Sequence, residues 1–66
     1  MNEDWVTVYS THDFFKAEII KNMLISNNIE AVNFNQKDSS YHFGLINIFA
    51  LKLKSKKAIE LINNEF

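Results

Sequence analysis

Hydrophobic and polar residues alternate along three short stretches of the chain, at 5–9, 31–35 and 45–53. Successive side chains of a β-strand point to opposite sides, so this pattern predicts three strands. Elsewhere apolar residues recur every three or four positions, which predicts one helix over 12–27 and a second from Ser55 onward. The predicted order of elements is therefore β-α-β-β-α.

The ends of both predicted helices carry recognisable signals. Ser10, Thr11 and Asp13 offer side-chain oxygens for the N-cap of the first helix, and Ser55 is expected to cap the second. Asn28 lies just beyond the first helix, where Asn commonly replaces glycine in a left-handed backbone conformation. The apolar face expected for the first helix comprises Phe15, Ala17, Ile19, Ile20, Met23 and Leu24. The apolar positions of the second helix are Ala58, Ile59, Leu61, Ile62 and Phe66.

The order of elements restricts the topology. A strand-helix-strand unit crosses over right-handed, so the first two strands are expected to be parallel, with the third strand antiparallel between them. The predicted fold class is α+β, a ferredoxin-like β-α-β-β-α two-layer sandwich. It has a three-stranded sheet in the order 1-3-2, both helices on one face and an open edge at the first strand. A chain of 66 residues is expected to form one domain, 1–66.

Composition and charge exclude several classes of function. The net charge of -1 and the absence of Arg argue against nucleic acid as a partner. The absence of Cys argues against disulfides and thiolate metal sites, and we expect no cofactor. No apolar run approaches the length needed to cross a membrane, and residues 1–4 do not resemble a signal peptide. A cytoplasmic location with no membrane association is therefore expected.

The side of the sheet away from the helices is the first candidate interaction surface. If alternation directs Val6, Val8, Val32, Phe34, Ile46 and Ile48 toward the helices, the opposite side holds Trp5, Thr7, Tyr9, Asn33, Asn35, Asn47, Phe49 and Leu51. Exposed apolar patches commonly mark protein contacts, and Trp and Tyr are common interface anchors. The interface residues proposed from this pattern are Trp5, Thr7, Tyr9, Asn47, Phe49 and Leu51. The alternative is an aromatic cluster that the N-terminal residues and Lys side chains cover.

The connection from Gln36 to Gly44 is the second candidate, because it is longer than most hairpin loops. Its candidate residues for a ligand or partner are Lys37, Asp38, Ser39, Ser40, Tyr41 and His42. In the alternative interpretation these side chains only stabilise the turn. A catalytic serine would need an oriented base and an oxyanion site, and the loop contains neither motif, so we expect no catalytic residues and no enzyme activity.

Four lysines near the second helix are a possible anion site: Lys52, Lys54, Lys56 and Lys57. Positive charge in the first turn of a helix opposes the helix dipole, and exposed helix N–H groups can bind phosphate or carboxylate. The alternative is a solvated strand end whose lysines discourage edge pairing. His12 and His42 flank different predicted elements, so no metal site is expected.

Several short motifs resemble a known bacterial family. They are Trp5-Val6-Thr7-Val8-Tyr9-Ser10-Thr11, Ala17-Glu18-Ile19 with Leu24, Asn28-Ile29-Glu30-Ala31, Lys37-Asp38-Ser39-Ser40-Tyr41 and Gly44. Together they resemble the small prokaryotic domains described as putative signal-transducing proteins, whose activity is not established. The resemblance implies a ferredoxin-like fold related to the nitrogen-regulatory PII proteins and a bacterial cytoplasmic setting. Two departures are Asn28, where such sequences often have Gly, and the basic stretch from Lys52 to Lys57, where they are often acidic.

These observations lead to two hypotheses of different classes. The favoured one is a binding or oligomerisation module that associates with another copy or with a protein partner through the open sheet face or the edge of the first strand. The alternative is a sensor that binds a small anionic metabolite with the 36–44 loop.

Overall fold

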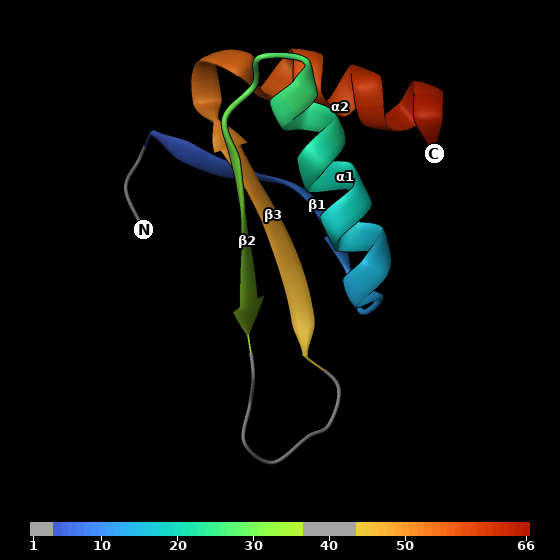
Figure 1. The fold of residues 1–66 in the computed structure, drawn as a ribbon. Coiled ribbons are helices and arrows are strands. Elements are labelled where there is room, and N and C mark those ends of the chain that lie inside the picture. The colour runs from blue at the N-terminus through green and yellow to red at the C-terminus, as the bar shows by residue number, and fades with distance from the viewer. Residues whose placement is uncertain (1–3, 37–43) are drawn as a thin grey trace.

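The computed structural model describes residues 4–36 and 44–66 (Figure 1). Its elements are β1 (Trp5–Thr11), α1 (Phe14–Ser26), β2 (Ala31–Gln36), β3 (Leu45–Leu51), a 3₁₀ turn (Lys52–Lys54) and α2 (Ser55–Glu65). The predicted order β-α-β-β-α is confirmed.

The three strands form one sheet in the order β1-β3-β2, in which both outer strands run antiparallel to β3 (Figure 1). β1 and β2 are therefore parallel to each other, as a strand-helix-strand unit requires. The ferredoxin-like α+β arrangement predicted from the sequence is confirmed.

A single cluster of buried side chains joins the helices to one face of the sheet. Its members are Ala17, Ile20 and Leu24 of α1, Ile29 and Ala31 before and in β2, Ile46, Ile48 and Ala50 of β3, and Ala58 and Ile62 of α2. Both helices contribute to this one core, so they cover the same face. The opposite face has no covering layer in the described part of the chain (Figure 1).

Both ends of α1 are held by local hydrogen bonds. The Asp13 carboxylate accepts from the backbone N–H of Lys16 at 3.1 Å, which is the N-cap contact. At the other end Asn28 has a φ of 64°, as predicted for a left-handed residue that ends a helix. The N–H of Ile29 donates to Leu24 and that of Asn28 to Ile25, both at 3.0 Å. This pair of bonds defines a Schellman motif and satisfies two carbonyls at the helix end.

The predicted core face of α1 is only partly correct. Phe15 is 76% exposed and Ile19 is 57% exposed, whereas Ala17, Ile20 and Leu24 are fully buried. Apolar residues occur around most of this helix, so their spacing alone does not identify the side that meets the sheet. Similarly, Ile59 of α2 and its C-cap residue Phe66 are exposed, while Ala58 and Ile62 are buried.

The boundary between β3 and α2 also differs from the prediction. The strand ends at Leu51, and the next three residues form the 3₁₀ turn, in which Leu53 is 97% exposed. Ser55 is the first residue of α2 and does not cap it; its hydroxyl donates to the Lys52 carbonyl at 2.8 Å. Lys54 is at the N-cap and makes no side-chain cap bond. In the sequence, polar and apolar residues keep alternating as far as Leu53, so this pattern does not reveal that the strand ends at Leu51.

Candidate interaction surface

A β-bulge changes which residues of β1 face the core. Trp5 pairs with Leu51 and Thr7 with Phe49, but the register then shifts so that Tyr9 pairs with Ile48. The extra residue reverses the alternation after Thr7. The prediction that Tyr9 faces away from the helices is therefore wrong, because Tyr9 packs against the core.

The polarity of β2 is the reverse of the prediction. Ala31 lies opposite Ala50, so Ala31, Asn33 and Asn35 share the helix side of the sheet. Val32 and Phe34 consequently point away from the helices, where they are 44% and 52% exposed. Assigning Asn33 and Asn35 to the outer side and these two apolar residues to the core was wrong.

The connection from α1 gives the physical reason for this orientation. Ile29, the last residue of the Schellman motif, is buried, and alternation from it directs the side chains at 31, 33 and 35 inward. The turn that precedes β2 thus determines which residues of the strand face the core, although this orientation places Asn33 beneath α1.

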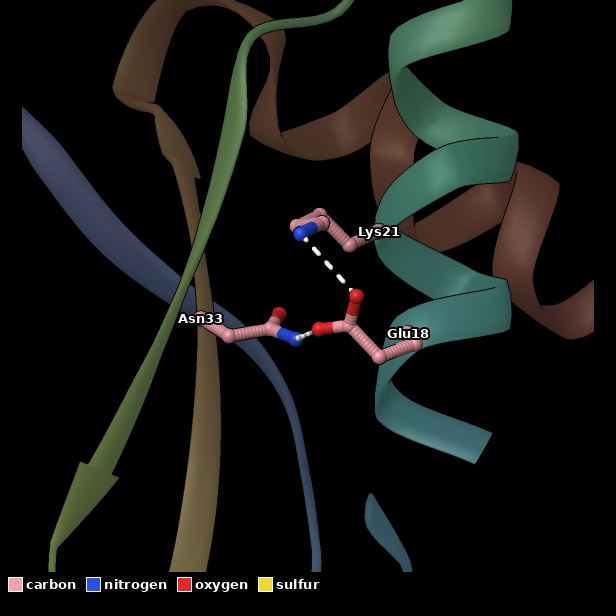
Figure 2. Close-up of polar contacts among 3 residues, drawn as sticks. All are labelled: Glu18, Lys21 and Asn33. Atoms are coloured by element: carbon pink, nitrogen blue, oxygen red, sulfur yellow. Dashed lines mark hydrogen bonds and ion pairs between the residues drawn. The ribbon is translucent and has the colours of Figure 1, made fainter. Parts of the chain in front are cut away.

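Asn33 is held beneath α1 by a small polar network (Figure 2). Its amide donates to one oxygen of Glu18 at 2.6 Å, and the Lys21 ammonium donates to the other at 3.2 Å. The side-chain oxygen of Asn33 is buried and makes no hydrogen bond. This network links α1 to β2 through a partly buried carboxylate and compensates only part of the cost of an inward asparagine.

We define the outer sheet face by nine described residues: Trp5, Thr7 and Ser10 of β1, Val32 and Phe34 of β2, and Leu45, Asn47, Phe49 and Leu51 of β3. None of the nine is charged. The rings of Phe34 and Phe49 pack edge to face, with centroids 6.3 Å apart. Ser10 donates to the side-chain oxygen of Asn47 at 2.6 Å, so these polar groups satisfy each other within the face. The surface is consequently more apolar than the sequence pattern predicted.

A shallow concavity of about 520 Å³ adjoins the outer sheet face at the start of β2. Its lining residues are Trp5, Ile25, Asn28, Ile29, Glu30, Ala31 and Val32. Trp5 and Val32 belong to both the concavity and the outer sheet face. An apolar side chain from a partner could therefore insert beside the indole while the partner covers the sheet.

The other predicted site residues occupy different places. Lys52 and Lys54 lie in the 3₁₀ turn and Lys56 and Lys57 in the first turn of α2, and all four are exposed. The Lys54 ammonium donates to the Asn28 carbonyl at 3.4 Å. The loop candidates Lys37, Asp38, Ser39, Ser40, Tyr41 and His42 lie outside the described residues.

Three further observations concern the described ranges. The Lys16 ammonium lies over the Tyr9 ring, 5.5 Å from its centroid, and hydrogen bonding with Tyr9 raises the pKa of Lys16. Across residues 4–36 and 44–66, no group of three His, Asp or Glu side chains could bind a metal ion. No helix in those ranges is long and apolar enough to span a bilayer.

Comparison with known proteins gives one informative result. Neither the curated proteins nor the solved structures show a significant match to this chain. The model of a family described as "Putative prokaryotic signal transducing protein" matches residues 5–64, a range that includes the whole sheet, α1 and all but the last residue of α2. The chain therefore belongs to this family.

Proposed function

We propose that this chain is a self-associating module of a signalling system, which pairs with a second copy through the outer sheet face and acts by binding rather than by catalysis. The observation that carries the proposal is the outward orientation of Val32 and Phe34 beside Phe49. A strand that directs its apolar residues away from its own core leaves surface that association would remove from water.

The chemistry of the face favours a second copy as its occupant. A two-fold interface brings a surface against itself, so any charged residue near the axis would meet its own like charge. The nine residues of the outer sheet face carry no charge, and Ser10 and Asn47 are already bonded to each other. Two copies can therefore stack their sheets without leaving a buried charge unpaired.

The size of the face limits the expected affinity. Three strands, of which the central one has 7 residues, cover a footprint about 24 Å long and about 14 Å wide. This area is well below the roughly 800 Å² per partner that typical stable complexes bury. We therefore expect a weak dimer whose population changes with protein concentration, with the concavity beside Trp5 adding contact area.

Sedimentation over a range of concentrations tests the proposal with a matched pair of variants. Phe34→Ser removes a half-exposed ring from the outer sheet face, and Phe66→Ser removes a similarly exposed ring at the C-cap of α2. We expect Phe34→Ser to raise the apparent dissociation constant at least tenfold, because apolar anchors dominate such interfaces. Phe66→Ser should leave it unchanged.

Two outcomes would contradict the proposal. In one, the sedimentation of Phe34→Ser is indistinguishable from that of the unmodified chain at every concentration. In the other, Phe66→Ser has the same effect as Phe34→Ser, which would indicate a general loss of solubility or folding. Circular dichroism of both variants separates a lost interface from a lost fold.

A further inference from the structure

The side of α1 that faces away from the sheet carries a second regular pattern. Phe15, Ile19, Asn22 and Ser26 follow one another at intervals of four, three and four residues. This spacing places them on one stripe of a helix, opposite the buried Ala17, Ile20 and Leu24. All four residues of the stripe are exposed. We call this set the α1 stripe.

The charges that flank the α1 stripe are engaged with their own chain. Glu18 accepts from Lys21 and from Asn33, both on the side of α1 that lies toward β2 (Figure 2). On the other flank, the Lys16 ammonium lies over the Tyr9 ring. The stripe itself contains no charged residue, and the Ser26 hydroxyl already donates to the Met23 carbonyl at 2.8 Å. Its association with another uncharged helix would break none of these contacts.

The sizes of the side chains indicate which helix fits. The stripe is bulky at its N-terminal end and small at its C-terminal end. When two copies run antiparallel about a point midway between residues 20 and 21, Phe15 meets Ser26 of the second copy and Ile19 meets its Asn22. Each layer then pairs one large with one small side chain, as close packing requires. In a parallel pair each residue would meet itself, so two Phe rings would crowd one layer and two Ser residues would leave space in another.

The same arrangement has favourable neighbours on both flanks. At the level of Glu18 the second copy has Met23, and at the level of Lys16 it has Ile25, so neither charge meets a like charge there. The two Asn22 amides would be only about 4.5 Å apart along the helix axis, given a rise of 1.5 Å per residue. Reciprocal hydrogen bonds between them would fix the register, as a single polar residue does in coiled coils.

From this pattern we infer that the α1 stripe is a second self-association surface, at which α1 packs antiparallel against α1 of another copy. The inference does not depend on the outer sheet face, which lies on the other side of the sheet. If both surfaces act, each chain contacts two neighbours and assembly continues beyond the dimer.

Cysteine cross-linking tests the geometry directly, because the chain contains no natural Cys. Asn22→Cys and Ser26→Cys each introduce one small thiol into the α1 stripe, and Asn64→Cys, at an exposed position of α2, gives the background of random collisions. In the antiparallel pair the two residues at 22 are close, whereas those at 26 are about 16.5 Å apart along the axis. A short bismaleimide should therefore cross-link Asn22→Cys well above background and leave Ser26→Cys at background.

The other cross-linking outcomes overturn the inference. Equal cross-linking at both positions would show a parallel pair. Background cross-linking at both would show that the α1 stripe does not pair, as when copies meet only through their sheets.

Sedimentation separates this inference from the proposed function. Phe15→Ser changes a residue that is 76% exposed, so it should fold normally. We expect the unmodified chain to exceed the mass of a dimer at high concentration. Phe15→Ser and Phe34→Ser should each stop at a dimer, and the double variant should be monomeric. If only Phe34→Ser lowers the mass, the α1 stripe is inactive and the proposed function stands; if only Phe15→Ser does so, the reverse holds.

Discussion

β2 and β3 are neighbours in the same sheet, yet they direct different kinds of residue toward the core. β3 directs Ile46, Ile48 and Ala50 into the core. β2 directs Asn33 toward the core and Phe34 away from it. The core side of the central strand is thus apolar, as is usual for a half-buried sheet, whereas the edge strand places an asparagine there.

The difference shows that the two strands serve different needs. The side chains of β3 are surrounded by both helices, so their packing supplies much of the stability of a domain with a small core. β2 contributes little apolar volume to that core, and its larger apolar side chains, Val32 and Phe34, lie on the exposed face instead. A strand with polar residues toward the core and apolar residues outward is expected where a protein binds a partner through its surface, and β2 has this arrangement.

The largest expected effect tests this division at Ile48, whose side chain is fully buried. Ile48→Ala should lower the free energy of unfolding by about 2–5 kcal/mol, because it leaves a cavity between sheet and helices. Val32→Ala on the outer sheet face should lower it by less than about 1 kcal/mol. Urea denaturation followed by circular dichroism measures both values.

A milder substitution guards against complete unfolding of the Ile48→Ala variant. Ile48→Val removes one methylene group and should cost about 0.5–1.5 kcal/mol. Ile48→Val removes one carbon atom and Val32→Ala removes two, so an equal loss per removed carbon atom would contradict the assignment of the two strands to core and surface.

An intermediate effect is expected from charge at the inward position of β2. Asn33→Asp places a second carboxylate beside Glu18 and removes the amide that donates to it. We expect a loss of about 1–3 kcal/mol at neutral pH, from the lost hydrogen bond and like-charge repulsion. Asn35→Asp is the matched control, since Asn35 also faces inward but is exposed, and it should cost less than about 0.5 kcal/mol.

The pH dependence of Asn33→Asp sharpens this test. Repulsion from Glu18 would raise the pKa of the new carboxyl in the folded chain above its unfolded value of about 3.9. The deficit should therefore be largest at neutral pH and shrink as the pH falls through the folded pKa, where one carboxyl is protonated. A deficit that is constant between neutral and acidic pH would indicate a packing effect rather than repulsion.

Much of the fold follows from local sequence signals. The order of elements follows from periodicity, and the end of α1 follows from Asn28, whose positive φ the sequence indicated. The bulge before Tyr9 has no comparable signal, because an extra residue in a strand of alternating β-branched and aromatic residues leaves no mark in composition. The orientation of β2 also escaped prediction, since hydrophobicity alone assigns Phe34 to the core.

The candidate surface shows the same division. Trp5, Phe49 and Leu51 were placed on the outer side correctly, because their positions before the bulge and along β3 preserve simple alternation. Val32 and Phe34 were missed because their outward orientation depends on Ile29 and on the contact between Asn33 and Glu18. Alternation counted from Ile29, rather than from the most hydrophobic residues of the strand, would have identified them.

The smallest effect is expected from the one polar pair within the outer sheet face. Ser10→Ala removes the hydroxyl that donates to Asn47, and both residues lie on the side away from the helices. Water can replace this bond in the monomer, so the free energy of unfolding should fall by no more than about 0.5 kcal/mol. In a dimer that covers the face, the same substitution leaves the Asn47 oxygen without a donor, so self-association should weaken more than folding does. Sedimentation and urea denaturation of Ser10→Ala measure the losses in the free energies of association and of unfolding. Equal losses in the two would place this pair outside the interface.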